Sequence, residues 1–105
     1  MRDDSFRDFV LDQLRDLGQV DCRRMFGSYG LYHGGVFFGI ISQGRLYFKT
    51  DATTQLEYER RGMAPFQPSA RQTLKSYYEV PVEVVEDDEQ LVGWAQRAVE
   101  SQTAA

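Results

Sequence analysis

Hydrophobic positions near the start of the chain recur with the period of a helix. Between residues 4 and 17 the large apolar side chains are three or four positions apart, which places them on one helical face. They are Phe6, Phe9, Val10, Leu14 and Leu17. We expect Asp4 or Ser5 to cap the start of this helix, and Gly18 to end it in a left-handed conformation.

From Val20 the pattern changes to short runs of aromatic and β-branched residues separated by glycines, which is typical of strands. The runs are Val20–Phe26, Tyr29–His33, Val36–Ser42 and Arg45–Thr50. The intervening glycines are turn signals, so three or four of these strands form an antiparallel meander. The third run is apolar at almost every position. It predicts a strand that is covered on both faces, or one that leaves a face for a partner.

The second half of the chain continues with a helix over residues 52–61, capped by Asp51 or Thr53 and stopped by Gly62. Pro65 and Pro68 bracket a short extended stretch around Phe66, because a residue before proline avoids helical angles.

Thr73–Val80 alternates in polarity and is predicted to be a strand, and Pro81 stands where a helix can begin. Asp87 and Asp88 cap a last helix over residues 88–100, and a frayed tail follows from Ser101.

This order of elements predicts an α+β fold. It is a two-layer sandwich with helices packed on one face of an antiparallel sheet, in the order α-β(3–4)-α-β(1–2)-α. The 105 residues are one domain's worth, so we assign residues 1–105 to a single domain. No apolar run approaches the roughly 20 residues that span a bilayer, and acids occupy the place of a signal peptide's apolar stretch. We therefore expect a cytoplasmic protein without membrane contact.

Charge is distributed unevenly within a net charge of −4. Residues 1–21 carry three bases and six acids, residues 22–78 eight bases and three acids, and residues 79–105 one base and seven acids. The basic residues therefore belong mainly to the sheet and the acidic ones to the terminal helices.

Several basic and tyrosine residues of the predicted strands fall on one polar side: Arg45, Tyr47, Lys49, Lys75 and Tyr77. On neighbouring strands they make a basic face that holds a nucleic-acid backbone and stacks bases. The simpler interpretation is a solvated polar face with tyrosines packed across strands. We favour the latter, because a chain of net charge −4 lacks the long-range attraction of nucleic-acid binders.

Catalytic chemistry has few candidates in this sequence. Cys22 and His33 are a conceivable nucleophile and base, but Cys22 lies in a predicted strand, and His33 adjoins a turn where it would be exposed. The acids of residues 87–89 complement a helix dipole, which is a sufficient reason for them without a cation. We predict no enzyme, no metal site and no cofactor.

Arg23 and Arg24 are adjacent in a predicted strand, so one of them points to the helix-covered side. A guanidinium there needs a carboxylate or carbonyl partner, and we expect Asp21 or a C-terminal acid to supply it.

Three stretches of the sequence resemble the N-terminal domain of the TfoX/Sxy family. They are RRMFGSYGLY from Arg23, GVFF from Gly35 and GRLYFKTD from Gly44. Later segments are similar in type and order: SYYEVP from Ser76 and LVGWA from Leu91. The likeness runs over about residues 5–100.

This resemblance implies a two-layer α/β sandwich and a regulatory role. TfoX/Sxy proteins promote expression of DNA-uptake genes in natural competence, together with the cyclic-AMP receptor protein. Many members carry a second, C-terminal helical domain that resembles DNA-binding helix–hairpin–helix units. We expect this chain, which ends at Ala105, to lack it. The family offers no established catalytic residue to carry over.

We therefore expect a non-catalytic interaction module that binds a protein in transcription control, with direct nucleic-acid binding as the alternative. The expected contact residues are Arg23, Arg24, Tyr29, Tyr47, Lys49 and Tyr77. Self-association through a sheet edge or face, giving a homodimer, is a corollary.

Overall fold

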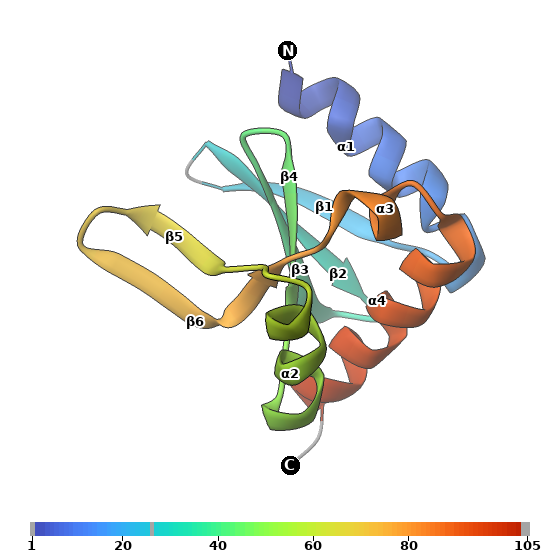
Figure 1. The fold of residues 1–105 in the computed structure, drawn as a ribbon. Coiled ribbons are helices and arrows are strands. Elements are labelled where there is room, and N and C mark those ends of the chain that lie inside the picture. The colour runs from blue at the N-terminus through green and yellow to red at the C-terminus, as the bar shows by residue number, and fades with distance from the viewer. Residues whose placement is uncertain (1, 26, 104–105) are drawn as a thin grey trace.

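A computed structural model describes residues 2–25 and 27–103, with side chains from residue 4 onward, and its element order is the α+β order that the sequence predicts (Figure 1). The helices are α1 (Arg2–Gln13), a short 3₁₀ turn η1 (Arg15–Leu17), α2 (Ala52–Arg60), α3 (Val82–Val85) and α4 (Asp88–Thr103). The strands are β1 (Asp21–Met25), β2 (Ser28–His33), β3 (Val36–Ser42), β4 (Arg45–Lys49), β5 (Pro65–Ser69) and β6 (Gln72–Glu79).

The six strands form one antiparallel sheet in the order β1-β2-β3-β4-β6-β5. The first four strands are a meander, and β6 crosses back to pair with β4 after α2. Since β5 pairs only with β6, the β5–β6 hairpin projects from the body of the molecule (Figure 1).

One face of the sheet, the covered face, carries the helices and the main core. Buried side chains of α1, α2, α3 and α4 meet those of β2, β3, β4 and β6 there. Phe38, Ile41 and Phe48 are fully buried strand residues of this core. Large aromatic and aliphatic groups thus supply most of the apolar area removed from water.

The opposite face of the sheet, the open face, has a smaller apolar cluster of strand residues only. It consists of Met25, Phe37, Ile40, Tyr47, Phe66, Leu74 and Tyr77. Strand β3 supplies both faces because successive side chains of a strand alternate. Its register against β2 shifts between Leu31 and Tyr32, so side chains three positions apart share a face: Phe37 and Ile40 lie on the open face, Phe38 and Ile41 on the covered face. The almost wholly apolar strand thus contributes to both layers, and the bulge sets which residues face each one.

Several predicted details of the first helix are wrong. Asp4 and Ser5 lie inside α1 and do not cap it, and Phe9 is 43% exposed although its spacing places it with the core residues. Gly18 has a φ of 111° with a ψ of −158°, which is an extended conformation of positive φ and not the left-handed helical one. The helix ends earlier than predicted, and η1 makes the turn into β1.

The caps of the later helices match the prediction. The Asp51 carboxylate accepts hydrogen bonds from the backbone N–H groups of Thr53 and Thr54 at 2.9 and 2.8 Å. The helix α3 begins after Pro81, and the Asp87 carboxylate accepts from the Gln90 N–H at 3.2 Å ahead of α4.

The predicted frayed tail from Ser101 is helical up to Thr103, while residues 104 and 105 lie outside the described residues, as does Phe26 of the first predicted strand. Helix α4 continues because Gln102 donates to the Phe37 carbonyl at 2.9 Å and to the Tyr77 hydroxyl at 3.2 Å. Within the described chain, no helix combines the length and apolarity needed to cross a membrane.

Candidate interaction surface

The open face is hollowed into a groove of about 410 Å³ between the β1–β2 hairpin and the β5–β6 hairpin. We call it the open-face groove. Its lining residues are Met25, Ser28, Phe37, Ile40, Phe66, Pro68, Gln72 and Leu74. Six of these eight side chains are apolar and none is charged. A concave apolar surface of this size is a usual form for a binding site.

Aromatic rings fix the shape of the groove floor. The Phe37 ring lies 5.2 Å from that of Tyr32 and 5.5 Å from that of Tyr77, measured between centroids. At the hairpin wall, the Tyr47 and Phe66 rings are 4.5 Å apart. Tilted contacts at these separations are favourable, so the rings hold the floor in place without a covering helix.

A glycine at position 30 leaves room for this packing. A Cβ added there would come within 3.1 Å of the Phe37 ring and 3.2 Å of the Met25 sulfur. Those contacts are tighter than ordinary van der Waals distance, so a larger residue would displace two lining side chains.

Charged groups of the open face lie around the groove and not in it. The Arg23 guanidinium lies 4.7 Å from the Tyr32 ring centroid. This cation–π contact holds a positive charge on the β1 side of the groove. Arg71 lies in the turn beside Gln72, at the tip of the opposite hairpin. Between the hairpins, the Arg45 guanidinium and the Glu79 carboxylate form an ion pair of 3.1 Å.

The predicted basic, tyrosine-bearing face is only partly assembled. The pairs Tyr47–Glu79 and Lys49–Tyr77 are directly opposed, so these residues do share the open face. Register irregularities between β5 and β6 bring both Leu74 and Tyr77, three positions apart, into the open-face cluster, so Lys75 lies in a stretch where simple alternation does not hold. The prediction of a polar face is wrong here, because strict alternation was assumed across a shifted register.

The remaining predicted contact residues, Arg24 and Tyr29, lie toward the covered face, where α1 meets β2. The hydroxyl of Tyr29 hydrogen-bonds the Asp4 carboxylate, and it accepts hydrogen bonds of 3.2 Å from both Arg7 and Arg24. The bond from Tyr29 holds the pKa of Asp4 below its usual value. Arg24 is therefore the arginine that turns to the helices, but its carboxylate partner is Asp4 at 4.0 Å and neither of the acids we expected.

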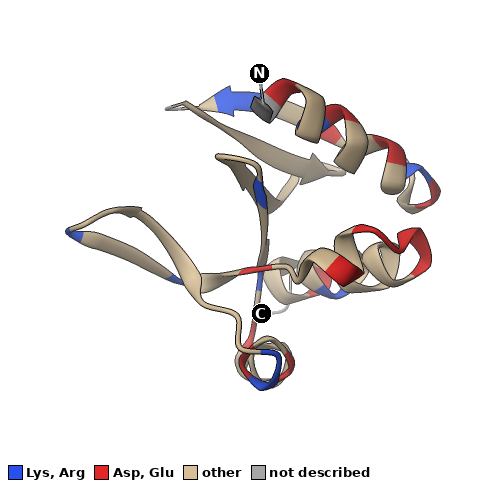
Figure 2. Ribbon diagram, turned by 45° about the horizontal axis from the view of Figure 1, so that its top comes forward, with Lys and Arg blue, Asp and Glu red and all other residues tan. Residues whose placement is uncertain are grey.

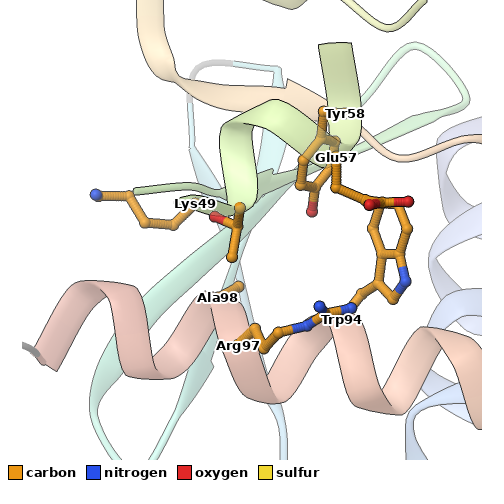
Figure 3. A pocket seen from close by; sticks show the side chains of 7 residues that line it. Lys49, Glu57, Tyr58, Trp94, Arg97 and Ala98 are labelled. Atoms are coloured by element: carbon orange, nitrogen blue, oxygen red, sulfur yellow. The ribbon is translucent and has the colours of Figure 1, made fainter. Parts of the chain in front are cut away.

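A second hollow lies between α2 and α4, and its volume of about 10 Å³ admits no more than a water molecule (Figure 3). Trp94 packs edge-on against Tyr58 at 4.8 Å, and burial raises the pKa of the Tyr58 hydroxyl. Arg61 and Arg97 stack on Trp94 at 5.1 and 5.8 Å, while the Lys49 side chain points away from the hollow. These contacts join two helices, and they leave no space for a substrate.

Cys22 and His33 do not form a catalytic pair. Burial raises the pKa of the Cys22 thiol, which disfavours the nucleophilic thiolate. His33 is half-buried and not exposed as expected, because its Nδ1 lies 2.8 Å from the Gln19 carbonyl oxygen. No hydrogen bond joins Cys22 to His33 in the described chain.

Sequence reasoning missed most of the groove lining. The doubly apolar run 36–41 was the one signal for an uncovered apolar face, and it indicates Phe37 and Ile40. Phe66 and Leu74 reach the groove through the pairing of two distant strands. No local pattern identifies such a pairing.

Comparison with known proteins places the chain in a family. The model of the TfoX N-terminal domain matches residues 12–102. The DNA transformation protein TfoX1 of Aliivibrio fischeri is 26% identical over 90 residues, which cover 84% of this chain and 43% of that protein. The chain thus spans less than half the length of this curated relative. Because the family model covers most of the sequence, the chain belongs to the TfoX N-terminal domain family.

Proposed function

We propose that this chain is a non-catalytic regulatory module that binds another protein through the open-face groove. The module acts in the cytoplasm, in the control of transcription. The family and the name of its relative suggest that the controlled process is DNA uptake. The observation that carries the proposal is an apolar groove of about 410 Å³ on a sheet face that no described helix covers. Such a surface gains free energy when a partner removes it from water.

Four of the predicted contact residues support this assignment by position. Arg23, Tyr47, Lys49 and Tyr77 belong to the open face, where they surround or floor the groove. Arg24 and Tyr29 are instead committed to holding α1, so we no longer propose them as contacts.

Direct nucleic-acid binding receives less support from the same geometry. Arg45 is paired with Glu79, and the Lys49 ammonium donates to the Thr50 carbonyl at 2.9 Å. The centre of the face is apolar. A phosphate backbone needs several accessible cations along its path, so a protein partner is the better fit.

Affinity capture from a bacterial lysate tests the proposal. The bait proteins are wild type, Leu74→Asp in the groove wall, and the matched control Leu56→Asp on α2, where Leu56 is 51% exposed. Circular dichroism and thermal unfolding establish that each bait is folded. We expect wild type and the control to retain a protein after nuclease treatment, and Leu74→Asp to lose it. Loss on nuclease treatment, retention by Leu74→Asp, or capture of nothing by wild type would overturn the proposal.

A further inference from the structure

We propose that the occupant of the open-face groove is a segment of a partner protein in which large apolar side chains are flanked by aspartates or glutamates. This inference rests on the proposed function and specifies the chemistry of the partner. It has two sources: the apolar lining of the groove, and the charges at its rim.

The lining requires apolar groups that the partner inserts. Phe37 forms the floor and Phe66 and Leu74 a wall, while Met25 is a flexible side chain that adapts to different shapes. The only polar side chains of the lining belong to Ser28 and Gln72, both at the ends of the hairpins. A polar or charged insert would therefore lose its water without gaining hydrogen bonds in the groove centre.

The two edges of the groove, which we call its rim, each carry a positive charge, Arg23 on one side and Arg71 on the other. Arg23 and Arg71 stand on opposite hairpins, and neither forms an ion pair with a described residue. Glu79, an acid of the open face, is paired with Arg45. Asp21 lies two positions beyond Arg23, farther from the groove, and accepts a hydrogen bond from Gln19.

The rest of the molecule carries a net negative charge. Figure 2 shows the acidic positions gathered on α1, α3 and α4, while basic positions mark the end of β1 and the tip of the β5–β6 hairpin. An acidic segment would be repelled from the helices and attracted to the rim, which favours binding in one place. Charge complementarity therefore selects acidic flanks over basic or neutral ones.

A phage-displayed library of random peptides tests this chemistry without knowledge of the partner. It is panned against wild type and against the double variant Arg23→Glu/Arg71→Glu. The control double variant, Arg15→Glu/Arg60→Glu, changes the net charge equally but lies on η1 and α2, away from the rim. We expect wild type and the control to enrich peptides that combine large apolar residues with Asp or Glu. Their affinity should fall about tenfold for the rim variant, and should fall as salt rises.

Each other outcome contradicts the proposal in a distinguishable way. Enrichment of neutral or basic apolar peptides that Leu74→Asp abolishes would overturn the acidic flanks and leave the proposed function standing. No enrichment by wild type would overturn both. Sedimentation showing a dimer that Leu74→Asp dissociates would make a second copy of this chain the occupant, in place of an acidic partner segment.

Discussion

The hydroxyl of Tyr29 donates a hydrogen bond to the carboxylate of Asp4 and so ties β2 to the first helix. Arg7 and Arg24 place their guanidinium groups 5.0 and 5.4 Å from the Tyr29 ring centroid and donate to the same hydroxyl. Tyr29, the tyrosine of the RRMFGSYG stretch, is therefore a structural residue. It organises a polar cluster that holds α1 over the sheet.

Replacing this carboxylate should remove a part of the stability that the wild-type protein loses in acid. Asp4→Asn should lower the thermal midpoint at pH 7, because the bond from Tyr29 depresses the pKa of Asp4 in the folded state. A depressed pKa gives stability above the unfolded value of about 3.9, and that stability is lost as the pH falls through the folded value. Thermal unfolding from pH 7 to pH 2 should thus show the two proteins converging in acid. A constant difference down to pH 2 would contradict this role.

The Asp51 cap should have a measurable effect on α2. Asp51→Ala removes the acceptor for the Thr53 and Thr54 N–H groups, and we expect a loss of about 1 kcal/mol in the free energy of unfolding. Urea denaturation at pH 7 measures it. Glu83→Ala, at an exposed acid in the first turn of α3, is the control and should change the free energy by less than about 0.5 kcal/mol. Equal effects of the two substitutions would argue against the cap.

Two glycines should respond oppositely to alanine. Gly93 lies in α4 with no neighbouring atom within 4 Å of an added Cβ, so Gly93→Ala should stabilise the protein by about 1 kcal/mol. Gly62 has a φ of 77°, which strains any residue with a Cβ, so Gly62→Ala should destabilise it by about 1 kcal/mol. Urea denaturation measures both. Destabilisation by Gly93→Ala would contradict the open space beside α4.

The single cysteine should be a poor nucleophile. Burial raises the pKa of Cys22, so its thiol stays protonated at neutral pH and should react slowly with iodoacetamide. Alkylation at pH 7.5 is compared with that of the chain unfolded in urea, where we expect a rate at least several times higher. A native thiol that reacts faster than the unfolded one would reopen the question of catalysis at this position.

Much of the fold could be predicted because its signals are local. The alternation of Leu46 and Phe48 with their polar neighbours marks a strand, and both side chains are buried on the covered face. Asp51 and Pro81 indicate where helices begin. Asp51 does so because its carboxylate caps backbone N–H groups, and Pro81 because its backbone angle suits a helix start.

The candidate surface was less predictable because it depends on long-range register. Leu74 joins the open face through irregular pairing of β5 with β6. The partner of Arg24 is Asp4, twenty positions away on a packed helix. A one-residue shift in a strand reverses which side chains face the core. The local sequence does not indicate at which residue such a shift occurs.

The two isoleucines of the chain give the most direct test of the open-face groove. Ile40 lines the groove, and its neighbour Ile41 is buried under the helices on the covered face. The methyl resonances of isoleucine-labelled protein should be followed while the most enriched library peptide is added. We predict that the Ile40 methyl signal shifts to saturation and the Ile41 signal stays in place. An Ile40 signal that does not move on saturation, or an Ile41 signal that moves equally, would contradict binding at this surface.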